Sequence, residues 1–243
     1  MRLKLIGCQL LQRELCDAVL RSPHLVDAEF LPAGLHDRGA KAMRARVQGA
    51  IDAAEAGRYD AVALGYALCG NGLAGIAARG TRLVLPRAHD CITLLLGGRA
   101  RYAERFAHNS GVFYRSVGWV ERAAEMTEQF IGQQSESDLD SLIERYGEEA
   151  GRYLYQELTA YRRCYSELAF IGTGLEPDGG FLESARREAA EKGWTFSCID
   201  GDLSLFRRLL AGDWGDDFLI VPPAHRIAAS YDEAIVSAQP AAA

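Results

Sequence analysis

Short apolar runs alternate with amphipathic stretches along most of this chain. The runs LKLIG at 3–7, DAVALGY at 60–66 and RLVL at 82–85 lack the strict alternation of strands with one exposed face, and this is typical of strands buried on both faces of a parallel sheet. Residues 10–21 and 39–57 carry apolar side chains at helical spacing. The pattern predicts an α/β fold with mostly parallel sheets flanked by helices.

The same alternation resumes in the last third of the chain. Strands are predicted at 167–172, 194–199 and 217–221, and helices at 178–192 and 202–211. The run LKLIGCQL near the start resembles LAFIGTGL at 168–175. Because both parts read strand, helix, strand, helix, strand, the pattern is compatible with two similar Rossmann-like halves.

These elements divide the chain into four expected parts. Residues 1–110 form a first α/β half that carries the candidate site, and residues 111–165 form a connecting strand and a long helix. Residues 166–235 form a second α/β half. The remaining residues, 236–243, are expected to form a disordered tail.

The composition narrows the functional classes. The chain has 243 residues, of which 49% are hydrophobic and 25% charged, as in ordinary globular proteins. The net charge of −6 argues against a nucleic-acid partner, and no apolar run is long enough to predict a membrane span. The first apolar stretch is short and broken by Gln9, unlike a secretory signal, so we expect a cytoplasmic protein that could form a homodimer.

Six cysteines carry the most informative chemistry. They are Cys8, Cys16, Cys69, Cys91, Cys164 and Cys198. Cytosolic thiols stay reduced, so a cluster of cysteines indicates metal binding or catalysis, whereas a single cysteine is usually a small core residue. The core interpretation is the expected one for Cys16, Cys164 and Cys198.

The other cysteines come directly after predicted strands. Cys8 follows LKLIG, Cys69 follows DAVALGY, and His89 and Cys91 follow RLVL. The carboxyl ends of parallel strands meet at one rim of a sheet, and ligands bind in the crevice there. We therefore expect remote segments of the chain to deliver thiols and an imidazole to one place.

The turn CGNG, which begins at Cys69, supports a ligand site. Gly70, Asn71 and Gly72 tolerate positive φ and let the backbone approach a bound cofactor. The turn leads into a helix expected at 72–79, and a helix N-terminus lowers the pKa of a nearby thiol. We therefore expect a lowered pKa for the Cys69 thiol.

The donor set suits a metal. Thiolates from Cys8, Cys69 and Cys91 with the imidazole of His89 match tetrahedral zinc. If His89 is the acid–base residue instead, the three cysteines leave an open position, as in catalytic zinc or a [4Fe–4S] cluster with one iron free. Zinc is the preferred interpretation. The alternative is that Cys8 and Cys69 pack in the core and His89 is an ordinary polar residue.

Further polar residues are candidates for catalysis beside His89. Arg87 could hold an anionic group of a substrate, and His225 could orient the substrate. His225 and His36 each follow a predicted strand, so either could act as general acid or base near the thiols. The sequence has no GxGxxG fingerprint after its first strand, no Walker loop and no GxSxG elbow.

Four segments resemble those of an uncharacterised prokaryotic family, a domain of unknown function. They are LPAGLHD at 31–37, GYALCGNGL at 65–73, PRAHDCITLLLG at 86–97 and VPPAHRIAASYD at 221–232, and the similarity extends over nearly the whole chain. Members are often encoded near corrinoid-dependent methyltransferases. The resemblance therefore implies a link to one-carbon metabolism and a corrinoid protein as a partner.

The resemblance also suggests an analogy at the level of the site. His89 and Cys91, with Cys69 or Cys8, are similar to the His-x-Cys pair and distant cysteine with which zinc methyltransferases of corrinoid pathways activate a thiol. Those enzymes are longer TIM barrels, so the analogy does not extend to the fold.

Three functional hypotheses follow from the sequence. The first is a metal-dependent enzyme of corrinoid-linked methyl transfer that acts on a small molecule or a corrinoid protein. The second is a non-catalytic accessory or cofactor-delivery protein for a corrinoid or metalloenzyme system. The third is a metal-free domain that binds a small organic molecule.

Overall fold

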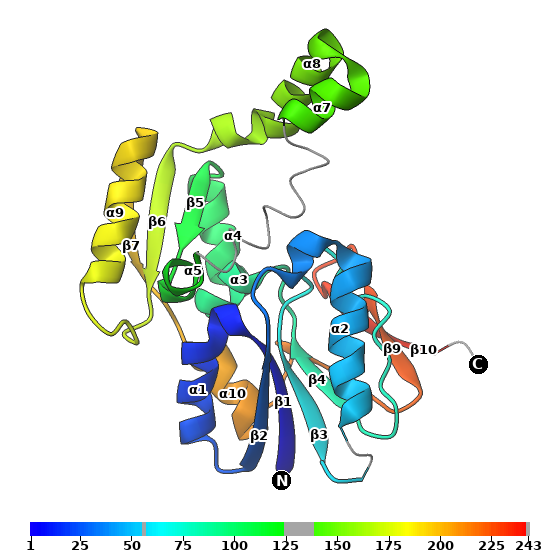
Figure 1. Ribbon diagram of the computed structural model, residues 1–243. Helices are drawn as coiled ribbons and strands as arrows, with labels where there is room; N and C mark the ends of the chain where they lie inside the picture. The colour runs from blue at the N-terminus through cyan, green and yellow to red at the C-terminus, as the bar shows by residue number, and fades with distance from the viewer. Residues whose placement is uncertain (55–56, 124–138, 242–243) are drawn as a thin grey trace.

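The structure is a computed structural model that describes residues 1–54, 57–123 and 139–241. It contains a larger, mostly parallel sheet and a smaller parallel sheet, each flanked by helices (Figure 1). The predicted α/β class with mostly parallel sheets is confirmed. No helix within the described ranges is both long enough and apolar enough to cross a membrane.

The larger sheet has five strands in the order β2-β1-β3-β4-β8. These are β1 (Arg2–Cys8), β2 (Leu25–Leu31), β3 (Ala61–Gly65), β4 (Leu83–Pro86) and β8 (Phe218–Val221). The first four are parallel, and β8 runs antiparallel to β4 at the edge. The neighbouring helices are η1 (Gln9–Leu11), α1 (Gln12–Arg21), η2 (Leu35–Arg38), α2 (Ala40–Ala53), α3 (Cys91–Leu95) and α10 (Ser204–Ala211).

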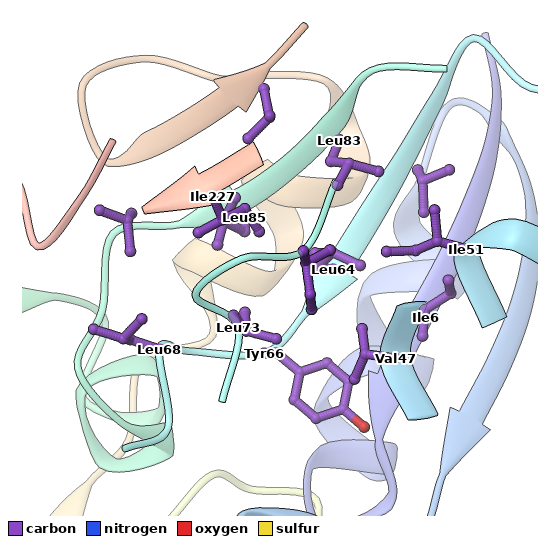
Figure 2. Packing of buried hydrophobic residues seen from close by; sticks show 14 of the residues in the cluster. Ile6, Val47, Ile51, Leu64, Tyr66, Leu68, Leu73, Leu83, Leu85 and Ile227 are labelled. Carbon is purple, nitrogen blue, oxygen red and sulfur yellow. The ribbon is translucent and has the colours of Figure 1, made fainter. Parts of the chain in front are cut away.

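Helices cover both faces of this sheet. Leu3 and Leu5 pack with α1 and α10 on one face, whereas Ile6 and Leu64 pack with Val47 of α2 on the other. Figure 2 shows the second of these clusters from close by. Each fully buried aliphatic side chain contributes about 1.5–3 kcal/mol. Burial on both faces explains why the strands read as apolar runs without alternation.

The smaller sheet has the order β5-β6-β7, with all strands parallel. These are β5 (Val112–Arg115), β6 (Glu167–Gly172) and β7 (Thr195–Asp200), flanked by α4 (Arg99–His108), α5 (Val117–Glu121) and α9 (Gly180–Lys192). Leu168 and Phe170 of β6 pack against Ala185 and Ala189 of α9. The strand at 112–115 was expected in a connecting segment and instead belongs to this sheet.

The two α/β halves of the chain are less alike than the repeated strand–helix pattern of the sequence suggests. The strand predicted in the second half at 217–221 is β8, which joins the larger sheet. Its apolar run FLIV fits an antiparallel edge as well as a parallel strand, so periodicity alone does not reveal its direction. The described residues form one sheet of five strands, one of three, and a separate two-stranded sheet near the C-terminus.

The predicted disordered tail is wrong for residues 236–240. They form β10 (Val236–Pro240), which pairs antiparallel with β9 (His225–Ala229). Val236 and Ile227 are fully buried beside β8 and anchor this hairpin to the larger sheet. An alternation of only two apolar residues is too short a pattern to predict this strand from the sequence.

The predicted long helix at 138–163 is also wrong within the described residues. The chain forms α7 (Leu139–Tyr146), α8 (Glu148–Thr159) and η4 (Ala160–Cys164). Gly147 has a φ of 82° and separates the first two helices, because a left-handed residue ends an α-helix. Gly151 lets them approach closely, since a Cβ there would lie 2.6 Å from the Ile143 backbone nitrogen. In Figure 1 this helix pair stands away from the larger sheet.

Candidate functional site

The structure brings Cys8, Cys69 and Cys91 to one cavity at the carboxyl ends of β1, β3 and β4. All three side chains are half-buried. The cavity has a volume of about 20 Å³, which is room for about one water molecule. Leu35, Met43 and apolar neighbours complete much of its wall. Cysteines from three remote segments therefore line one small space.

Strand register explains this convergence. The parallel ladder between β1 and β3 pairs Gly7 with Gly65, so Cys8 and Tyr66 follow at the same level of the sheet. Beyond the strands, the backbone N–H of Cys69 donates to the carbonyl of His89 over 2.9 Å. The segment after β3 thus runs beside the segment after β4, which brings Cys69 close to Cys91.

The CGNG turn adopts the backbone that the sequence predicts. Cys69, Gly70 and Asn71 have φ values of 46°, 60° and 66°, so three consecutive residues are left-handed. A Cβ on Gly72 would lie 2.2 Å from the sulfur of Met43, so a larger residue there would displace the Met43 side chain. None of Gly70, Asn71 and Gly72 lines the cysteine cavity in the described structure.

The helix predicted at 72–79 is wrong, and so is the lowered thiol pKa that depended on it. Residues 72–79 form turns and a bridge between Ala77 and Arg226. Burial raises the pKa of the Cys8 thiol to about 11 and that of Cys69 to about 12, with the Cys8 charge adding to the effect on Cys69. Burial also raises the pKa of Cys91, and Cys69 adds to that shift. The thiols are therefore protonated at neutral pH unless a cation compensates their charge.

Tyr66 adds a polar group that the sequence analysis missed. Its side chain lines the cavity and is 2% exposed, and its hydroxyl has no hydrogen-bond partner among the described residues. Figure 2 shows the hydroxyl turned away from Leu64 and Leu73. A buried hydroxyl without a partner costs free energy, so such groups often mark a ligand position. In the sequence Tyr66 lies within an apolar run and looks like a core residue.

His36, rather than His89, lines the cysteine cavity. His36 lies in η2 after β2, and its Nε2 is 3.3 Å from Oδ1 of Asp37. A carboxylate on one ring nitrogen orients the imidazole and leaves the other nitrogen for a ligand. Both histidines are exposed, and His89 lines a separate cavity of about 730 Å³ with Tyr102.

The guanidinium of Arg87, expected to hold an anionic group of a substrate, instead donates hydrogen bonds to backbone carbonyls. Its Nη1 donates to the carbonyl of Ala234 over 2.9 Å and to that of Val236. The guanidinium therefore ties the β9–β10 hairpin to the end of β4.

His225 lies away from the cysteines. Because β8 is antiparallel, its last residue, Val221, pairs with Leu83 at the start of β4. The chain that follows β8 therefore leaves the sheet near the start of β4, at the other end of the strands from Cys91. There the Nδ1 of His225 is 3.0 Å from the Pro223 carbonyl. The expected position of His225 beside the thiols is wrong.

The remaining cysteines are separate from the cavity. Cys16 is half-buried on α1, whereas Cys164 and Cys198 are exposed, contrary to the expected core positions. In the described ranges, no group of three or more His, Cys, Asp or Glu side chains is placed to hold a metal ion as the side chains stand. Metal binding by the clustered cysteines thus requires side-chain movement toward one another.

A wider cleft opens beside the cavity. It has a volume of about 430 Å³, and Cys91 and His36 line both spaces. Asp37 and Asp90 lie on the same side as these residues, and the far wall comes from α4, β5 and α5. The cleft thus runs between the two sheets, and its volume suits a small organic ligand.

The sequence was compared with known proteins. A family model, protein of unknown function DUF1638, matches residues 30–210. The chain belongs to this family. The matched region includes Cys69, Cys91 and His36 and begins after Cys8. No curated protein and no solved structure matches the chain.

Proposed function

We propose that this DUF1638 protein binds one metal ion through Cys8, Cys69 and Cys91. The observation that carries the proposal is that these thiols, from three different segments, line a single cavity. Thiolates are soft ligands that select zinc or iron–sulfur clusters over hard cations. Uncompensated thiolates in this apolar cavity are unfavourable, as the raised thiol pKa values indicate, and a divalent cation would remove that penalty.

The size of the cavity favours zinc over a cluster. A volume of about 20 Å³ accommodates one ion, whereas a [4Fe–4S] cluster needs space for four irons and four sulfides. Zinc binding would place the three sulfurs at about 2.3 Å from the ion. A cluster would require the surrounding strand ends to separate.

Two further residues support the same site. The imidazole of His36, held by Asp37 on one nitrogen, is suited to be the fourth ligand or the acid–base residue. The Tyr66 hydroxyl can donate to a cysteine thiolate and so gain the partner it lacks. His89 is not part of this set, because it faces a different cavity.

The site is suited to a metal-dependent enzyme that acts on a small molecule in the adjacent cleft. When bound, zinc supplies a Lewis acid that activates a thiol or water. His36 would take or give the proton, since it lines both the cavity and the cleft. A corrinoid-linked methyl transfer stays a prediction from the family resemblance, as does the alternative of a non-catalytic cofactor-delivery protein.

Metal content tests the proposal. Protein purified without oxygen and with reduced thiols should contain about one zinc per chain by elemental analysis. Cys8→Ser, Cys69→Ser and Cys91→Ser should each lower zinc affinity at least about tenfold, while Cys198→Ser, at an exposed thiol, should not. Equal zinc binding by all four variants would reject the site, whereas wild-type protein without bound zinc would favour the metal-free binding domain.

A further inference from the structure

Aromatic rings and carboxylates are prominent among the side chains that line the cleft beside the cysteines. Aromatic rings form much of its far wall: Tyr102 and Phe106 of α4, Phe113 and Tyr114 of β5, Trp119 of α5, and Tyr165. Two carboxylates, Asp37 and Asp90, lie at the end nearest the cysteine cavity. The cleft therefore has apolar walls and a negatively charged end.

Four of the rings form two packed pairs. The ring centroids of Tyr102 and Phe106 are 6.2 Å apart with an angle of 16° between the rings. Phe113 and Tyr165 meet edge to face at 5.2 Å. The faces of aromatic rings carry partial negative charge, so a surface of this kind attracts cations and repels anions.

The positive charge on the cleft wall is already neutralised. Among the described residues that line the cleft, the guanidinium is that of Arg115. Its Nε and Nη2 donate to the two carboxylate oxygens of Glu188, each over 2.8 Å. An anionic ligand would thus meet two carboxylates and ring faces with no unpaired guanidinium to receive it.

Among the described residues, the hydrogen bonds of the Asp90 carboxylate go to one of its two oxygens. Its Oδ1 accepts from the backbone N–H and the hydroxyl of Thr93, over 2.9 Å and 2.8 Å, at the start of α3. These bonds fix the carboxylate beside Cys91 without neutralising its charge. Its negative field also reaches the opposite wall, because it contributes to raising the pKa of Tyr102, for which burial is the largest cause.

We propose that this cleft binds a small organic cation, an ammonium group carrying apolar substituents, with its charge between Asp37 and Asp90 and its apolar part against the rings of Tyr102 and Phe106. The ligand would lie next to Cys91 and His36, so this inference deepens the proposed function and names a substrate class for the same site. Binding itself requires the cleft alone and can be measured without metal.

Three probes with one apolar group and different charges test the proposal. Isothermal titration calorimetry should show that tert-butylammonium binds, and that neutral tert-butanol binds at least about tenfold more weakly. Pivalate, the anionic analogue, should bind most weakly of the three. Equal affinity for all three, or preference for pivalate, would overturn the proposal.

Substitutions place the binding in this cleft. Asp90→Asn keeps an oxygen for the Thr93 cap but removes the charge, and should weaken tert-butylammonium binding about tenfold. The matched control is Asp178→Asn, because Asp178 also accepts a backbone N–H near the start of a helix, over 2.7 Å, outside the cleft. Unchanged affinity in Asp90→Asn, or equal loss in both variants, would refute the assignment.

The metal and cleft proposals fail in different ways. Protein that lacks zinc but binds tert-butylammonium through Asp90 would support the cleft and reject the metal site. Protein that binds zinc through its cysteines but shows no charge preference among the probes would support the metal site and reject the cleft proposal. Titrations of metal-free and zinc-loaded protein separate these outcomes.

Discussion

Glu14 offers a quantitative test of how the first helix packs. It lies in the first turn of α1 with 0% of its surface exposed. Its Oε1 is 3.4 Å from the Thr173 hydroxyl, and its Oε2 has no hydrogen-bond partner among the described residues. Glu14→Gln removes the charge and keeps an oxygen acceptor for Thr173.

The magnitude follows from the pKa of the Glu14 carboxyl. Burial raises this pKa from 4.5 to about 7. At about 1.4 kcal/mol per pH unit, this shift corresponds to about 3 kcal/mol. Between these pKa values the folded protein binds more protons than the unfolded chain, so the wild-type free energy of unfolding falls as pH rises. Above about pH 7 the full penalty of a buried carboxylate is present.

Urea denaturation under reducing conditions measures the effect. At about pH 8, Glu14→Gln should be more stable than the wild type by up to about 3 kcal/mol, and most of this difference should vanish at about pH 5. Glu191→Gln, which removes an exposed carboxylate on α9, is the matched control and should follow the wild type at both pH values. A Glu14→Gln stability difference that does not change with pH would refute the buried, proton-binding carboxyl.

Three further predictions can be checked by urea denaturation and by measuring the affinity for zinc or tert-butylammonium. Gly65→Ala should destabilise the protein by about 1–3 kcal/mol, because its Cβ would lie 2.7 Å from Leu15 Cδ1. The control Gly49→Ala should stabilise α2, because a Cβ there meets nothing within 4 Å. Equal effects of the two substitutions would contradict this packing. Tyr66→Phe should stabilise metal-free protein by about 1 kcal/mol and weaken zinc binding, and unchanged zinc affinity would separate Tyr66 from the site. Arg87→Gln should cost about 1–3 kcal/mol without changing tert-butylammonium affinity, and loss of affinity alone would restore a ligand-binding role.

The gathering of the cysteines could be anticipated because it depends on a general property of the fold. Parallel strands end at the same rim, so residues that follow such strands meet whatever the details of the connections. Cys8, Cys69 and Cys91 each follow a parallel strand, and they share one cavity.

The positions of the histidines could not be predicted in the same way. His225 follows an antiparallel strand, and an apolar run does not encode its direction. His89 and His36 both follow parallel strands, but which one faces the cavity depends on the local path of the loop. The backbone at His89 pairs with that at Cys69, while its side chain is exposed.

Buried polar groups were also invisible to the sequence patterns. Glu14 lies in an amphipathic helix, where a glutamate usually faces solvent, but the loop after β6 covers it through Thr173. Tyr66 reads as one more apolar residue of a buried strand. Both are set by contacts between segments far apart in the sequence, which local periodicity does not report.

X-ray absorption at the zinc edge tests the central claim most directly, because it counts the sulfur atoms around the ion. Zinc-loaded protein should show three sulfur ligands at about 2.3 Å and one nitrogen or oxygen ligand at about 2.0–2.1 Å. Cys91→Ser should reduce the sulfur count by one, whereas Cys198→Ser should leave it unchanged. A shell of nitrogen and oxygen alone, or a sulfur count that Cys91→Ser does not alter, would contradict metal binding by the gathered cysteines.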